Sequence, residues 1–189
     1  MNKYGEEISY NFDLLKVEDY NDLQPFTCGN DRLDYHIHHE IIKNGMIVDE
    51  DGLYFIFRDL ETQKIIAVVS LATSGILYQI DNYTHILPAI KIDVLAVEKQ
   101  YQKVHYNEGS KMSSDPSEHY YFSDDIMGVI VTHCREIAEK KALTSYIVLY
   151  ADKQAYRYYI RNGFLDYQRF MVKERNQEIN ENIPMYMQL

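Results

Sequence analysis

Two adjacent runs of apolar residues constrain the fold more than any other feature of this sequence. "GLYFIFRD" (52–59) and "KIIAVVSLAT" (64–73) are rich in β-branched and aromatic residues, and a short polar stretch separates them. Residues of these types favour strands, and a short polar connection between two strands favours a hairpin. The sequence therefore predicts an antiparallel hairpin here.

Five further segments show apolar alternation or short apolar runs, which are typical of strands. They are residues 10–16, 89–97, 145–150, 164–172 and 183–188.

Three segments carry helix signals, with a capping Asn, Ser or Asp at the start and apolar residues three or four positions apart in the two longer ones. The first begins at Asn30 and is predicted to end near Asn44–Gly45. The second begins at Ser123, and the third begins at Asp152 and stops at Asn162–Gly163.

Residues 99–122 form a long polar insertion that fits neither pattern. The stretch "KQYQKVHYNEGSKMSSDPSEHYYF" contains Gly109, Pro116 and several serines and has no period. Loops of this length within a compact domain are either functional or disordered.

Composition limits the classes of protein. A chain of 189 residues is predicted to form a single domain, 1–189. Cys28 and Cys134 are too few and too far apart for a disulfide framework, and the N-terminal residues lack the apolar core of a signal peptide. We therefore expect a cytoplasmic protein with no membrane span. The net charge of −10, with no basic run, makes a nucleic-acid partner unlikely.

The order of the predicted elements, together with three motifs, resembles the GCN5-related N-acetyltransferase (GNAT) superfamily. "LAV" (95–97) followed by "KQYQ" looks like the strand before the family's pyrophosphate loop, and "YYIRNGF" (158–164) resembles a widespread signature. "FTCGNDRLDYHI" (26–37) is similar to the opening of one branch, which includes acetyltransferase toxins paired with antitoxins.

The resemblance implies an α/β (α+β) fold. Its sheet would be mixed, twisted and mostly antiparallel, with about six to seven strands, a splayed parallel strand pair and flanking helices. It also implies transfer of an acetyl group from acetyl-coenzyme A to an amine of unknown identity. A homodimer is compatible with the sequence.

The same resemblance implies site residues. The pantetheine arm would bond the backbone of Leu95, Ala96 and Val97, and Tyr159, four residues ahead of Gly163, would protonate the departing sulfur. Such a transfer needs an acid for the thiolate and a base for the amine. The alternative for Tyr159 is a packed aromatic, and Tyr156 and Tyr158 are expected to be structural.

Asp93 occupies the strand position where many members of the family carry a catalytic Glu. Alternation places Asp93 on the same face as Leu95 and Val97, so it is the candidate base, with Glu98 a weaker one. The alternative is a solvent-facing aspartate.

The predicted coenzyme-binding loop departs from the family pattern. Members carry Gln/Arg-x-x-Gly-x-Gly/Ala, and Gln102 fits the first position, but His105 and Asn107 replace the glycines. Asp124 and Asp125 would also repel phosphate at the start of the following helix. Candidate cofactor ligands are therefore the side chains of Gln102 and Lys103, with help from Lys99, His105 and Lys111.

Two alternatives to an active enzyme remain. One is a binding module that has lost the coenzyme, and the other is a toxin that acetylates aminoacyl-tRNA. "HIHH" (36–39) has no partners at metal-ligand spacing, so no metal site is expected. Cys28 is expected to serve turn geometry rather than to act as a nucleophile.

Overall fold

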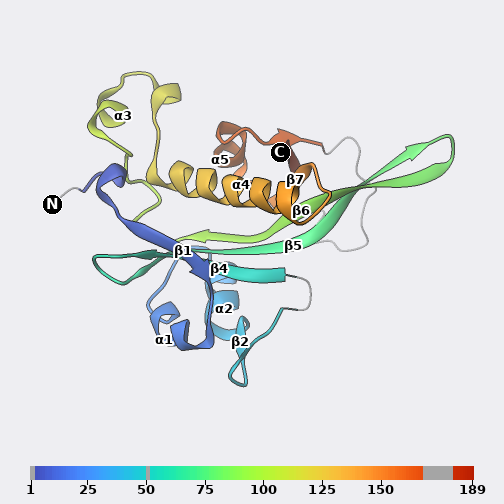
Figure 1. Cartoon of the computed structure of the whole chain (residues 1–189). Coiled ribbons are helices and arrows are strands. Elements are labelled where there is room, and N and C mark those ends of the chain that lie inside the picture. Colours follow the sequence, from blue (N-terminus) through green and yellow to red (C-terminus); the bar gives the residue numbers. More distant parts are fainter. Residues whose placement is uncertain (1–2, 50–51, 168–180) are drawn as a thin grey trace. The chain divides into compact units, whose positions relative to one another are not determined.

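The structure is a computed structural model that describes residues 3–49, 52–167 and 181–189. Seven strands form a sheet in the order β1-β4-β5-β6-β7-β9-β8, and β2 and β3 form a second, small sheet (Figure 1). The strands are β1 (Tyr10–Leu14), β2 (Ile42–Lys43), β3 (Met46–Ile47), β4 (Gly52–Asp59), β5 (Ile65–Ile80), β6 (Tyr83–Val97), β7 (Tyr146–Ala151), β8 (Leu165–Asp166) and β9 (Ile183–Gln188).

Five α-helices accompany the sheet in the described ranges. They are α1 (Tyr20–Leu23), α2 (Asp31–His39), α3 (Glu108–Met112), α4 (Phe122–Lys140) and α5 (Tyr156–Arg161). Because β6 and β7 pair in parallel while β1–β4, β7–β9 and β8–β9 pair antiparallel, the predicted mixed α/β fold is confirmed. No helix in the described ranges is long and apolar enough to cross a membrane.

The chain divides into two compact units. The first comprises Met1–Leu71 with Val94–Ile126, and the second comprises Ala72–Asp93 with Met127–Leu189. β5, β6 and α4 run from one unit into the other. The single domain expected from the sequence stays a prediction.

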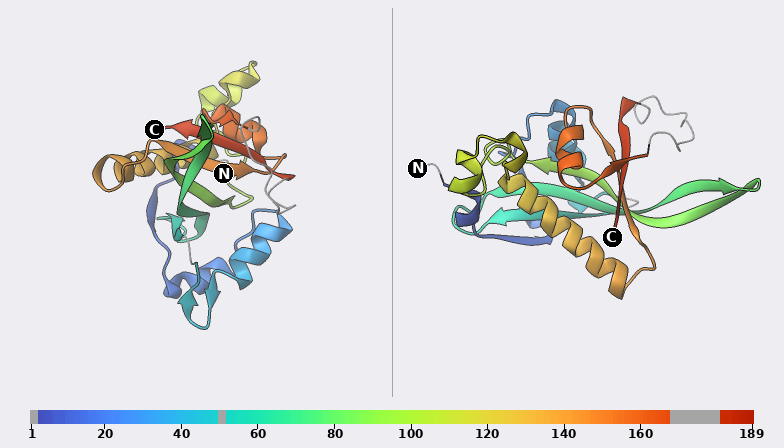
Figure 2. Two further views of the ribbon diagram at one scale, coloured as in Figure 1. Left: turned by 90° about the vertical axis from the view of Figure 1, so that its right-hand side faces the viewer. Right: turned by 90° about the horizontal axis from the view of Figure 1, so that it is seen from above.

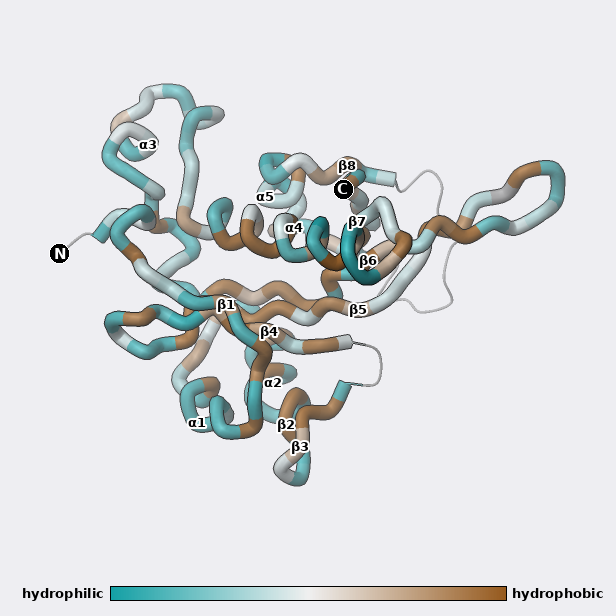
Figure 3. Tube along the Cα trace, viewed as in Figure 1, coloured by the Kyte–Doolittle hydropathy of each residue, from teal (hydrophilic) through white to brown (hydrophobic). Residues whose placement is uncertain are grey.

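In the first unit, β4 and β5 supply the core. The predicted hairpin between them is confirmed, and Asp59 N–H donates to the Lys64 carbonyl at 3.0 Å across its turn. The strands are strongly hydrophobic along this stretch (Figure 3), as expected for strands buried on both faces. The buried cluster joins them to α1, α2 and the end of β6 through Leu15, Leu23, Phe26, Ile37, Ile41, Tyr54, Ile56, Ile65, Val68, Val94 and Ala96.

The predicted end of the first helix is wrong. α2 ends at His39, and Asn44 (φ 52°) and Gly45 (φ 73°) form the two-residue turn that joins β2 to β3. Asn-Gly with two positive φ angles is the preferred pair for such a hairpin. The dipeptide was therefore a hairpin signal and not a helix stop.

Two predicted caps also differ from the structure. α4 begins at Phe122, so Ser123 lies within its first turn. α5 begins only at Tyr156, and the Asp152 carboxylate accepts instead from Gln154 N–H at 2.7 Å in the preceding turn. Asn162 and Gly163 (φ 87°) do end α5, as expected.

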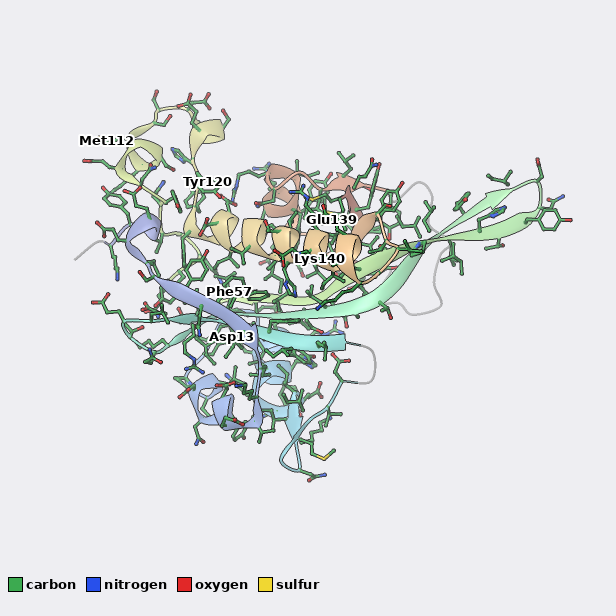
Figure 4. The ribbon with its side chains drawn as sticks, viewed as in Figure 1. Asp13, Phe57, Met112, Tyr120, Glu139 and Lys140 are labelled. Carbon is green, nitrogen blue, oxygen red and sulfur yellow. The ribbon has the colours of Figure 1, made fainter. Side chains whose placement is uncertain are left out.

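The polar insertion is folded, in contrast to its lack of sequence period. It contains α3, a 3-10 turn at Pro116–Glu118 and a β-bridge between His105 and Tyr121. Figure 4 shows Met112 and Tyr120 on this segment. Its backbone binds the N-terminal segment, since Gly5 N–H donates to the His105 carbonyl at 2.9 Å. A Cβ atom at Gly5 would lie 2.9 Å from Phe122 Cβ, so only glycine permits this approach.

In the second unit, β7 lies between β6 and β9. The parallel ladder runs from Ala89–Tyr146 to Ile92–Leu149, and β6 then continues to Val97. On its other side β7 pairs with β9 in antiparallel fashion over all six residues. The strand predicted at 164–172 begins as β8, and residues 168–172 lie outside the described residues.

The second unit also contains a long two-stranded arm, which we define as residues 72–88. It consists of the second part of β5 and the first part of β6, joined by Asp81 (φ 48°) and Asn82 (φ 68°) (Figures 1 and 2). The sequence had predicted strands only up to residue 73 and from residue 89, so most of this arm was missed.

Candidate functional site

Tyr159 is the one buried residue of α5. Its side chain is 8% exposed and packs edge-on against the rings of Tyr158 and Phe164, with centroid distances of 5.3 and 5.7 Å. Burial raises the pKa of the Tyr159 phenol, and the charge of Asp152 raises it further. The hydroxyl therefore keeps its proton throughout the neutral pH range.

The "YYIRNGF" motif explains how Tyr159 is held. Gly163 adopts a positive φ of 87° and turns the chain, so that Phe164 N–H donates to the Tyr159 carbonyl at 3.0 Å. The buried Phe164 ring then packs edge-on against the Tyr159 ring. Tyr158 instead lies beside the Arg161 guanidinium, 5.6 Å from its ring centroid, and is partly exposed, in agreement with a structural role.

Asp93 lies where alternation predicted. Ile92, Val94 and Ala96 are buried, while Asp93 is on the opposite, more open face. Its side chain is 47% exposed, and one carboxylate oxygen lies 2.5 Å from the Lys91 ammonium. This pairing fits the solvent-facing alternative, and a role as the base stays a prediction.

The Gln102 side chain forms hydrogen bonds with backbone carbonyls of the first unit. Its amide nitrogen donates to the Val97 carbonyl at 2.8 Å and to the Cys28 carbonyl at 2.7 Å. The Glu98 carboxylate accepts from Gln100 N–H in the same turn. Gln102 and Glu98 thus shape the loop after β6, and their proposed roles toward a ligand stay predictions.

The "TCGN" turn is built around the Asp34 carboxylate. It accepts from the Thr27 hydroxyl at 2.7 Å, from Cys28 N–H at 2.8 Å and from Gly29 N–H at 3.3 Å. Burial alone would raise the pKa of Asp34, but these hydrogen bonds outweigh it and lower the pKa. Asn30 then caps α2 by accepting from Arg32 and Leu33 N–H.

Cys28 is a structural residue of this turn. Burial raises the pKa of its thiol to about 11, so the reactive thiolate is scarce at neutral pH. The expectation that Cys28 serves turn geometry rather than acting as a nucleophile stays a prediction.

The start of α4 is occupied by groups of the protein itself. Phe122 N–H donates to the Val104 carbonyl at 2.8 Å, and the buried Asp124 carboxylate accepts from Tyr121 N–H at 2.9 Å. The Tyr10 hydroxyl donates to Asp125 at 2.7 Å. A helix start with bound carboxylates does not fit a diphosphate, which needs free N–H donors and no competing negative charge.

Several basic side chains named from the sequence lie in the first unit. Lys99 and Lys103 are exposed. The Lys111 ammonium lies 5.8 Å from the centroid of the Tyr4 ring. Burial lowers the pKa of His105, as do the charges of His119 and Lys111, so His105 is neutral at pH 7. Of the side chains named from the sequence, Lys99, Lys103 and Lys111 are exposed cations.

The histidines of "HIHH" have structural partners. His36 contacts the Glu40 carboxylate at 3.0 Å and the Tyr54 hydroxyl at 2.8 Å, and His38 contacts the Phe26 carbonyl at 2.7 Å. In the described ranges, no three His, Cys, Asp or Glu side chains are grouped as a metal site requires.

Comparison with known proteins gives a fold but no sequence family. No protein-family model matches the sequence. No curated protein matches it either.

Solved structures do match over nearly the whole chain. A crystal structure of a bacterial toxin has a TM-score of 0.67 at 16% identity, covering 96% of this chain and 91% of the other. A second match is a tyrosine-to-phenylalanine mutant of the toxin AtaT, bound to the C-terminus of the antitoxin AtaR and acetyl-CoA. It has a TM-score of 0.61 at 15% identity, covering 95% of this chain and 93% of the other. AtaT complexed with acetyl-methionyl-tRNAfMet has a TM-score of 0.61 at 13% identity, covering 95% of each chain. At these identities the likeness establishes a shared fold.

Proposed function

We propose that this chain, whose fold is that of the GCN5-related N-acetyltransferases, transfers an acetyl group from acetyl-coenzyme A to an amine. The observation that carries the proposal is Tyr159, a buried phenol that keeps its proton and follows β7 of the parallel strand pair. The binding of acetyl-CoA by a structural neighbour adds support.

The proposed chemistry needs few groups. The amine nitrogen forms a bond to the thioester carbon, the carbon–sulfur bond breaks, and Tyr159 gives its proton to the departing thiolate. The amine's proton passes to Asp93 or Glu98, directly or through water. Backbone groups of Leu95, Ala96 and Val97 would hold the pantetheine arm.

The two ends of the coenzyme fit this chain differently. A protonated phenol at Tyr159 is available for the proposed role at the thioester end, whereas the start of α4 does not fit a diphosphate. We propose that Lys103, with Lys99, binds the diphosphate through side-chain charge, while Gln102 holds the loop that carries Lys103. The affinity for acetyl-coenzyme A should accordingly be weaker than a glycine-rich loop provides.

Calorimetric titration with acetyl-coenzyme A at moderate salt tests binding first. Binding at micromolar to submillimolar concentrations supports the proposal and justifies a screen of amines. Tyr159→Phe should then lower kcat by about 100-fold or more while the dissociation constant is unchanged, because only the proton donor is lost. Tyr158→Phe, at the neighbouring and partly exposed ring, is the matched control and should keep full activity. Equal kcat values for Tyr159→Phe and wild type would refute the role of Tyr159.

A second candidate is a GNAT-fold module without coenzyme. The occupied start of α4 favours it, because Asp124 and Asp125 lie where a phosphate would need positive potential. Absence of both heat and thermal stabilisation at millimolar acetyl-coenzyme A would support this candidate and exclude the enzyme.

A third candidate is an aminoacyl-tRNA acetyltransferase, favoured by the "CGNDRLD" turn and by the AtaT complex with acetyl-methionyl-tRNAfMet. The net charge of −10 weighs against it, since binding to tRNA gains affinity mainly from basic groups. Incubation with labelled acetyl-coenzyme A and aminoacyl-tRNA, beside free amines, distinguishes the substrates.

A further inference from the structure

The arm lies beyond the residues of β5 that pair with the described part of β4 and the residues of β6 that pair with β7. The described part of β4 begins at Gly52, which the register of the β4–β5 hairpin places near Leu71 of β5. The parallel ladder to β7 begins only at Ala89 of β6. Within the described ranges, the two strands of the arm thus have each other as neighbours in the sheet order (Figure 2). Such a two-stranded ribbon is only marginally stable in water by itself.

Large apolar side chains are exposed along this ribbon. Ile80 (52% exposed) and Tyr83 (74%) flank the Asp81–Asn82 turn. Leu77 (52%) and Ile86 (65%) come three residues further along each strand, and so lie on the other face of the ribbon. Tyr78 and His85 stack across the strands at 5.1 Å, as this register requires. Apolar groups on both faces indicate a surface that is covered by a partner.

The arm is almost uncharged within a strongly charged chain. Asp81 is its one Asp, Glu, Lys or Arg, whereas the chain has 19 basic and 29 acidic residues. A nucleic acid or an anionic membrane surface would need basic side chains that the arm does not have. A protein surface fits, because the centres of protein interfaces are depleted of charge and enriched in aromatic and apolar residues.

We propose that the arm is the docking surface of a homodimer, in which each arm packs against the other copy around a two-fold axis. Two copies of a chain with a net charge of −10 repel one another, and an almost uncharged arm adds little to that repulsion where it packs against the other copy. Two-fold symmetry gives the arm of each copy the same contact on the other copy, so the arm contact is made twice.

The area supports a second copy over an unrelated partner. About eight residues per strand give a ribbon about 26 Å long and about 10 Å wide, so its two faces present about 500 Å². One arm on an unrelated protein would bury about 1,000 Å² in total, at the lower limit for a specific interface. Two reciprocal arms would bury about 2,000 Å², which is within the range of stable dimers.

Sedimentation equilibrium of the full chain across a range of protein concentrations tests the proposal. The wild type should sediment as a dimer that dissociates on dilution. Leu77→Thr combined with Ile86→Thr keeps β-propensity and removes apolar surface, and should raise the dimer dissociation constant by more than about 100-fold. Replacement of residues 77–86 by Asn-Gly, which closes the hairpin at Ile76 and Leu87, should leave a monomer.

The matched control is Leu143→Thr. Leu143 is 98% exposed in the second unit but outside the arm, so its substitution should leave the dissociation constant unchanged. Circular dichroism and thermal melting verify that each variant is folded. A wild type that stays monomeric up to about 100 μM, or a dimer that survives both arm variants, would overturn the proposal. Monomer that co-sediments with vesicles of phosphatidylcholine and phosphatidylserine would also overturn it, in favour of a membrane surface.

Discussion

The Asp34 carboxylate should contribute more to stability than a surface aspartate does. It accepts two short hydrogen bonds, from the Thr27 hydroxyl and Cys28 N–H, and a longer one from Gly29 N–H. A hydrogen bond to a charged group contributes about 1.5 kcal/mol at the lower end of the measured range, which suits this partly exposed site. Asp34→Ala should therefore lower the free energy of unfolding by about 3 kcal/mol.

Urea denaturation followed by circular dichroism measures this change. With a denaturant slope of about 2 kcal/mol per molar, the midpoint for Asp34→Ala should fall by about 1.5 M. Asp31→Ala is the matched control, since Asp31 lies in the same first turn of α2 and is exposed. Asp31→Ala should lower the free energy of unfolding by no more than about 0.5 kcal/mol.

The pH dependence tests the cause. Because folding lowers the pKa of Asp34, its contribution is fully present above the unfolded value of about 3.9 and is lost as the pH falls through the folded value. The difference between wild type and Asp34→Asn should thus shrink as the pH is lowered from 7 toward 3. Equal midpoints for Asp34→Ala and Asp31→Ala, or a difference from Asp34→Asn that does not change with pH, would refute this account.

Two further predictions concern titrating groups. Thiol labelling with a disulfide reagent at pH 8 should be about 100-fold slower at Cys28 than at a free cysteine, since its pKa is raised to about 11, and the buried Cys134 should react only on unfolding. Equal rates for Cys28 and free cysteine would contradict this. Because folding lowers the pKa of His105, the insertion should be fully stable above about pH 6.5 and lose stability as the pH falls below it. Hydrogen exchange in residues 105–121, corrected for intrinsic pH effects, should then be faster at pH 5.5 than at pH 7.5 in wild type but not in His105→Gln.

Local patterns predicted the elements that are held by local chemistry. Leu33, Ile37 and Ile41 do face the core, and Asn30 caps α2, because four-residue spacing and a capping amide act within one turn. The parallel pair β6–β7 followed from the order of elements and a family resemblance rather than from any pattern within the strands themselves. Asp93 was placed on the correct face by alternation, but its Lys91 partner was not foreseen.

The errors arose where long-range contacts decide the structure. The arm has Gly75 and Pro88 where strands are usually uninterrupted, and Asp81–Asn82, flanked by apolar residues, was the available hairpin signal. Order in the insertion depends on partners far along the chain, such as the Gly5 contact with His105. No window of neighbouring residues contains that information.

The N-terminal segment that closes the insertion has a consequence for biosynthesis. Gly5 N–H bonds His105, and its Cα approaches Phe122, so the groups that hold residue 5 emerge from the ribosome long after it does. At 5–20 residues per second, about 100 intervening residues take roughly 5–20 s to synthesise. During that time the backbone around Gly5 lacks its partners in the insertion, and a chaperone or a neighbouring nascent chain can capture it. Slower translation between β1 and the insertion should therefore lower the yield of folded protein more than an equal delay after α4.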